Sequence, residues 1–126
     1  MFELTIGGTV YQFKFGLGFA REIDKKKKRN VNGVEQDAGL QFAVASVIDQ
    51  DPVALVDILN LANKGMNPRV TDKLLDAYLE DEETDIDQIF EDVLDFLRKA
   101  NATKKATAAV EQMVEQEMAK AAQTAQ

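Results

Sequence analysis

The chain contains no cysteine and no histidine among its 126 residues. Without cysteine it has neither a disulfide framework nor a thiol nucleophile, which is compatible with a reducing compartment. Without histidine it lacks the side chain that most often transfers protons near neutral pH, and a frequent zinc ligand. These two absences remove most hydrolase and zinc-site hypotheses together. We expect no enzyme activity, no cofactor and no metal site.

Long apolar runs are also missing. No uninterrupted apolar stretch is long enough to span a bilayer. The N-terminus begins with strand-like alternation, whereas a signal peptide needs a basic and then an apolar leader. We therefore expect a soluble protein of the cytoplasm, with no membrane partner. Apolar residues still make up 45% of the chain, which is enough to build the core of one domain of this length.

The formal charge of −7 is concentrated in the later part of the chain. Residues 1–50 carry 7 basic and 6 acidic side chains, whereas residues 51–126 carry 8 basic and 16 acidic ones. Such a surface repels phosphate backbones, so we expect no nucleic-acid partner for the body of the domain.

One compact basic run stands apart from this acidic character, namely Lys25, Lys26, Lys27, Lys28 and Arg29. At the solvated end of a first helix, these cations would favour the negative end of the helix dipole. Alternatively, the run contacts phosphates or an acidic partner, and the acidic second half of this same protein is one such partner.

The first 15 residues predict a two-stranded antiparallel hairpin. Gly7 and Gly8 supply the positive φ angles that a two-residue turn requires, and both flanks alternate apolar with polar residues. With this turn, Phe2 faces Phe13. One face then carries the apolar residues Phe2, Leu4, Ile6, Tyr11, Phe13 and Phe15.

This apolar face needs a partner surface, because an isolated hairpin is marginal in water. It packs either on the protein's own helices or on another protein. The second alternative provides a first set of candidate partner-binding residues, which are Phe2, Leu4, Tyr11 and Phe13.

The rest of the chain predicts helices. Apolar periodicity indicates them over residues 19–29, 40–48, 53–62, 71–79 and 85–99. Asp51 and Pro52 form a start signal, because Asp caps free amides and Pro is tolerated in the first turn. Residues 30–39 lose the helical period, and Asn32 with Gly33 indicates an ordered turn or a flexible excursion. We expect an α+β fold, predominantly α-helical, with the N-terminal hairpin followed by about five to six helices.

Six carboxylates crowd residues 80–87 and resemble the front of a calcium loop. Counting from Asp81, the sixth position is Ile86 where that loop needs glycine, and the twelfth is Asp92 where it prefers glutamate. We expect instead a solvated loop in which Thr84 caps the next helix and the acids favour its positive end.

Beyond Asn101 the composition shifts to Ala, Thr, Lys and Gln. A weak helix is predicted over residues 103–120, with a sparse stripe of Val110, Met113, Val114 and Met118. Such a helix either frays or offers an adaptable contact to a partner, because methionine tolerates imperfect fits. These four residues form the second set of partner-binding candidates. We divide the chain into a domain at 1–100, with its hairpin at 2–15, and a weakly helical or partly disordered tail at 101–126.

Several segments follow one another in a distinctive order: LTIGG at 4–8, YQFKFGLGFAREIDK at 11–25, NGV at 32–34, GL at 39–40 and DP at 51–52. This order resembles the tail assembly chaperones of long-tailed, siphovirus-type phages and prophages of Gram-positive bacteria. The resemblance covers about residues 1–100 and rests on the whole pattern.

The resemblance implies a non-catalytic role in the cytoplasm of the bacterial host. Proteins of this kind bind the long, helical tape measure protein, keep it soluble and extended, and are displaced as tail tube protein assembles around it. They are not expected in the mature virion. Many also have a longer form, made by a programmed frameshift, that recruits the tail tube protein. Because an extended client favours side-by-side packing of copies, we also expect self-association.

Another class of function stays open at this point. An acidic helical protein can act as a phage-encoded inhibitor or adaptor that binds another protein, with its carboxylates imitating the phosphates of DNA. That role requires a rigid row of acids over one face, for which the candidates are Asp81, Glu83, Asp85, Asp87, Glu91 and Asp95. An enzyme would require a nucleophile beside a base, and the sequence indicates no such pair.

Overall fold

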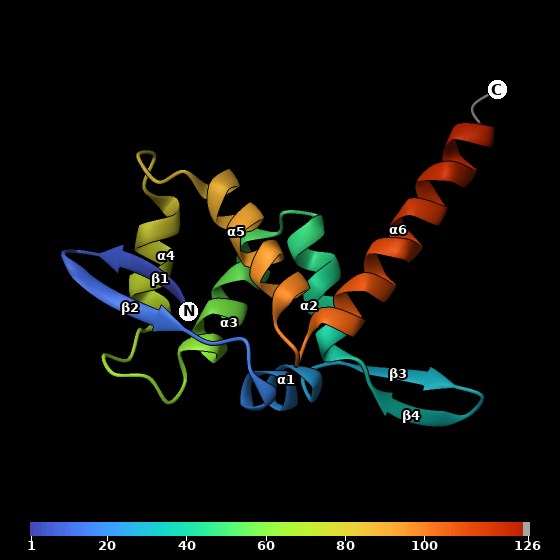
Figure 1. Ribbon diagram of the computed structural model, residues 1–126, viewed down its shortest axis with the longest axis horizontal. Coiled ribbons are helices and arrows are strands. Elements are labelled where there is room, and N and C mark those ends of the chain that lie inside the picture. Colours follow the sequence, from blue (N-terminus) through green and yellow to red (C-terminus); the bar gives the residue numbers. More distant parts are fainter. Residues whose placement is uncertain (125–126) are drawn as a thin grey trace.

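The computed structural model describes residues 1–124. Over this range the chain is an α+β fold dominated by helices, as predicted (Figure 1). The first hairpin is β1 (Phe2–Ile6) and β2 (Thr9–Phe13), and a second is β3 (Lys28–Val31) and β4 (Val34–Asp37). The helices are α1 (Leu17–Asp24), α2 (Gly39–Ile48), α3 (Pro52–Asn63), α4 (Asp72–Glu80), α5 (Ile86–Lys99) and α6 (Lys104–Thr124).

The first hairpin has the predicted register and buries the predicted face. Phe2 pairs with Phe13 across the two strands, and all six residues of the apolar face are buried. The centroids of the Phe2 ring and the Phe96 ring on α5 are 5.4 Å apart. Just after β2, the Lys14 N–H donates to the Ala62 carbonyl of α3 at 2.8 Å. Of the two alternatives for this face, packing on the protein's own helices is the one observed.

The second hairpin corrects the predicted first helix. The prediction of helix to residue 29 is wrong, because α1 ends at Asp24 and β3 begins at Lys28. Asn32 and Gly33 both have positive φ, 53° and 83°, which is the tight turn that joins twisted antiparallel strands. The basic run therefore begins at Lys25, the C-cap of α1, and continues into β3 with Lys28 and Arg29, instead of forming the last turn of a longer helix. Of the two alternatives for Asn32 and Gly33, the ordered turn is the one observed, and its flanking strands, which are mostly polar, are not predicted.

Helix α3 lies at the centre of the core, where Leu55, Ile58 and Leu59 are fully buried. It starts as predicted: Asp51 accepts hydrogen bonds from the Val53 and Ala54 amides. The predicted cap of α5 is wrong by one residue. Asp85 accepts from the Gln88 N–H at 3.1 Å, while the Thr84 hydroxyl donates backwards to the Tyr78 carbonyl at 2.6 Å. A carboxylate next in line is the stronger acceptor for the free amides.

One buried polar side chain ties α3 to the first hairpin and to the loop before α4. The Asn63 amide is fully buried and donates to the carbonyls of Gln12 and Pro68 at 2.9 and 3.3 Å. Its oxygen accepts from the Val70 N–H at 2.6 Å and from the Arg69 guanidinium at 2.9 Å. Both polar atoms of the Asn63 side chain have hydrogen-bond partners, so its burial leaves no polar group unsatisfied.

The junction of α1 and α2 is a second close contact. Gly39, the first residue of α2, is buried against the last turn of α1. A Cβ added at Gly39 would lie 1.8 Å from the Ile23 carbonyl oxygen. The Asp24 carboxylate also accepts a hydrogen bond from the Leu40 N–H at 3.2 Å. The two helices therefore meet backbone to backbone at the base of the second hairpin.

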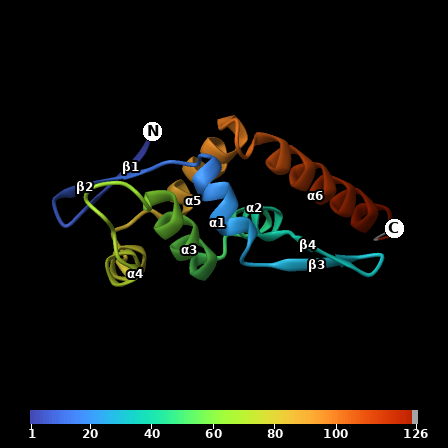
Figure 2. The same cartoon turned by 90° about the horizontal axis from the view of Figure 1, so that it is seen from below.

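Helix α6 starts inside the body of the fold and then leaves it. The buried hydroxyls of Thr103 and Thr107 both donate to the Leu97 carbonyl of α5, at 2.8 and 3.1 Å. Arg98 donates through Nε to Oε1 of Glu111 at 3.0 Å and through Nη2 to Oε2 at 2.8 Å. Residues 115–123 are all exposed, and Figures 1 and 2 both show α6 and the β3–β4 hairpin extending to the same side.

The Arg98 pair makes the joint between α5 and α6 sensitive to acid. Hydrogen bonds from Arg98 hold the pKa of Glu111 below its ordinary value of 4.5. Partial burial of Glu111 opposes this shift, and the positive charge of Arg98 adds to it. Because the folded pKa is the lower one, the pair stabilises the fold fully above pH 4.5, and the contribution is lost as pH falls through the folded value.

We expect Glu111→Gln to lower the free energy of unfolding by less than about 1 kcal/mol at neutral pH, because the pair is partly exposed. Well below the folded pKa the variant and the wild type should unfold alike. Urea titrations at neutral pH and well below the folded pKa measure the difference in unfolding free energy between variant and wild type. Glu115→Gln, one turn further along α6, is the control. An equal loss at both pH values would contradict the assignment.

Candidate interaction surfaces

The structure separates the two predicted sets of partner-binding residues. Phe2, Leu4, Tyr11 and Phe13 lie under the first hairpin, and all four are buried. The α6 set differs from residue to residue. Val110 is buried and Val114 is half-buried, whereas Met113 and Met118 are 56% and 67% exposed.

The exposed methionines border a shallow apolar hollow between α6 and α2. Its lining combines the α6 stripe with residues beside it: Ala45, Val110, Met113, Val114, Glu117, Met118 and Ala121. The hollow measures about 360 Å³. Glu117 is its one charged residue, so this is a surface suited to an apolar side chain or an amphipathic helix.

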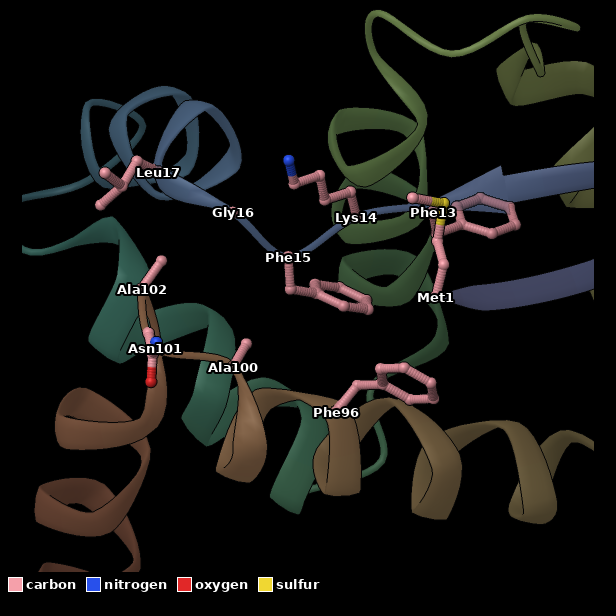
Figure 3. Close-up of a pocket in the computed structure, with 10 residues that line it drawn as sticks. All are labelled: Met1, Phe13, Lys14, Phe15, Gly16, Leu17, Phe96, Ala100, Asn101 and Ala102. Atoms are coloured by element: carbon pink, nitrogen blue, oxygen red, sulfur yellow. The ribbon is translucent and has the colours of Figure 1, made fainter.

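A second hollow of about 440 Å³ lies where the chain passes from β2 to α1 (Figure 3). Figure 3 shows the rings of Phe15 and Phe96 between the strand end and α5, while the Lys14 ammonium points away from Phe96. Apart from Lys14, no residue of the lining has a charged side chain. Sequence periodicity indicated Phe15 and Phe96 as apolar positions but gave no sign that they meet at the edge of a hollow.

A comparison with known families decides the assignment. The family model described as phage tail assembly chaperone protein, TAC, matches residues 3–112. The chain belongs to this family of phage tail assembly chaperones. The match runs from β1 through α5 into the first part of α6, so it extends beyond the first 100 or so residues that carry the resemblance. No similar curated protein and no similar solved structure was found.

Membership of the tail assembly chaperones implies a non-enzymatic role in tail assembly and binding to other phage tail proteins. Within residues 1–124, no group of carboxylates is arranged to hold a metal ion. Over the same residues, none of the helices is both long enough and apolar enough to cross a membrane.

In this chaperone, half of the acids suggested as phosphate mimics have local structural roles. Asp81 accepts a hydrogen bond from the Glu83 N–H at 3.0 Å, and Asp85 is the N-cap of α5. Asp95 pairs with Lys99 at 2.8 Å, one turn further along α5. These carboxylates end a helix, begin the next one and pair within it, so their placement follows from the fold itself.

Proposed function

We propose that this chaperone binds the tape measure protein of a long-tailed phage, keeps it soluble and extended, and leaves it as tail tube protein assembles. The family assignment carries this proposal. It includes action in the cytoplasm of the bacterial host, with a Gram-positive bacterium as that host, absence from the mature virion, and self-association along the client. A frameshifted longer form would bring in the tail tube protein.

The uncovered side of α6 supports the proposal physically. A tape measure protein rich in apolar helix surface aggregates unless that surface is covered, and exposed methionines adapt to many apolar partners. Met113, Val114 and Met118 are the members of the predicted set that a partner reaches without opening the core. The acidic surface of the chaperone would keep the complex in solution by charge repulsion.

Co-expression tests both the function and the surface. We expect the long helical protein encoded nearby to be soluble with the wild type and to co-elute with it in size-exclusion chromatography with light scattering. Replacing Met113 and Met118 by glutamate should reduce the soluble client about fivefold or more, because charges would face its apolar surface.

The matched control places the same two charges on the opposite side of α6, as Ala108→Glu and Ala119→Glu. Both alanines are exposed, and helical periodicity turns them away from the methionine stripe. Equal loss of client with both pairs would count against the α6 surface. A client that stays insoluble with the wild type would overturn the proposed function.

A further inference from the structure

The β3–β4 hairpin is exposed along almost its whole length. Val31 is half-buried, every other strand residue is exposed, and Val34 at the tip is 59% exposed. The register places Arg29, Val31, Val34 and Gln36 on one face of the ribbon. A two-stranded ribbon with so little cover is marginal in water, so it gains stability from any surface that receives this face.

The stem of this hairpin carries unneutralised positive charge. Residues 25–37 contain five basic side chains against Glu35 and Asp37, a net charge of +3. Lys28 pairs with Asp37 across the strands. Within the described part of the chain, Lys25, Lys26, Lys27 and Arg29 form no ion pair. The hairpin therefore presents cations beside apolar residues.

A groove of complementary character lies between the starts of α3 and α5 and along α4. Its apolar floor consists of Pro52, Val53, Val56, Leu79 and Ile86, and its acidic rim of Asp57, Asp72, Asp76 and Glu80. It measures about 560 Å³, and Val53 is 76% exposed within it. The rim carboxylates form no ion pair with any residue in 1–124, although Asp72 accepts a hydrogen bond from Asn60.

The β3–β4 strands and α4, which lines the groove, lie toward opposite ends of the molecule in both views (Figures 1 and 2). Lys26 and Lys27 at the base of the stem line a small hollow with Asp57 of the same chain. The strands that carry Arg29, Val31 and Val34 extend away from α4, so this ribbon face does not cover the groove floor of its own chain. We propose that the β3–β4 hairpin of one copy docks into the α3–α4–α5 groove of a second copy. Its valines would cover the apolar floor, and Lys27 and Arg29 would meet the acidic rim.

Charge complementarity favours this occupant. The four rim carboxylates are opposite in charge and equal in number to the four stem cations, and none of the eight forms an ion pair within residues 1–124. Asp57 lines a hollow with Lys26 and Lys27 of its own chain, so Asp72, Asp76 and Glu80 are the rim acids that lie apart from the stem. A contact between two different surfaces of the same chain is head to tail, so each added copy leaves one hairpin and one groove free. Copies would then add in a row or close into a ring. This inference rests on the self-association in the proposed function and gives it a defined interface.

A charge exchange between two full-length variants tests the interface. The hairpin variant carries Lys27→Glu and Arg29→Glu, and the groove variant carries Asp76→Lys and Glu80→Lys. Each variant alone should have its self-association weakened at least about tenfold, because like charges would face each other. Mixing them should restore association, since each hairpin then meets a groove of opposite charge. Analytical ultracentrifugation of the separate and mixed proteins measures this.

Matched controls move the same charge elsewhere. Lys104→Glu with Lys105→Glu reproduces the charge change of the hairpin variant, and Glu91→Lys with Glu115→Lys reproduces that of the groove variant; all four positions are exposed. These controls should associate like the wild type. Circular dichroism of each variant establishes that it is folded. Wild-type association should also weaken with added salt, because the contact is partly electrostatic.

Three results would overturn the interface: a strictly monomeric wild type, a loss of association equal in the controls, or no recovery on mixing folded variants. If the groove variant loses the tape measure protein but associates normally, the groove receives the client and not the hairpin. The proposed function is judged separately by client solubility with the wild type. Restored association on mixing, together with an insoluble client, would keep this interface and reject the chaperone role toward that client.

Discussion

Replacing Gly39 by alanine should lower the free energy of unfolding by about 3 kcal/mol or more, although the change adds a single methyl group. The new Cβ would lie 1.8 Å from the Ile23 carbonyl oxygen, 2.8 Å from the Ile23 carbonyl carbon and 2.9 Å from the Asp24 carbonyl oxygen. All three are backbone atoms of α1 and its end, so no side-chain rotation relieves the overlap. The two helices would have to move apart.

Gly18→Ala is the matched control for this prediction. Gly18 lies within α1, and a Cβ there meets nothing within 4 Å. Alanine is the better helix former, so this variant should gain up to about 1 kcal/mol. Urea denaturation followed by circular dichroism compares the two. Similar stabilities for both variants would mean that α1 and α2 do not meet as closely as described.

Replacing Asn63 by leucine should cost about 3 kcal/mol of unfolding free energy. The change removes the acceptor of the Val70 N–H and the donor to the Gln12 carbonyl, and each group left unpaired in a buried place costs about 1–3 kcal/mol. The effect should extend beyond α3, because the first hairpin and the loop before α4 share this side chain.

Asn101→Leu is the control, because Asn101 is exposed in the turn between α5 and α6. That change should alter stability by no more than about 0.5 kcal/mol. Hydrogen exchange would add a local test, in which the Val70 amide loses protection in the Asn63 variant only. Unchanged protection at Val70 would contradict the described network.

The predictable parts of the fold were those with local signals. Two adjacent glycines between flanks that alternate apolar with polar residues predicted the first hairpin, its register and its buried face. Asp51 and Pro52 gave the start of α3. The second hairpin escaped prediction because Val31 and Val34 are the only apolar residues of its two strands, too few to give an alternating pattern. Only the Asn32–Gly33 turn marked its place.

Sequence periodicity does not predict which residues of the candidate surfaces are exposed or which helices come together to form them. The stripe on α6 was visible in the sequence, but spacing alone does not tell that Val110 is buried against the body while Met113 stays exposed. The acidic groove is built from three helices, so its floor of Val53 and Ile86 appears only when they are packed. The division of the chain at residue 100 stays a prediction.

Because Phe2 packs against Phe96, the first hairpin cannot complete its packing until α5 has been synthesised. The first strand to leave the ribosome packs on a helix that is among the last to be made. At about 5–20 residues per second, the aromatic face of the first hairpin waits on the order of 5 to 20 s for its covering helix. During that interval the nascent chain exposes several phenylalanines, so translation speed and host folding factors should influence the yield of this protein.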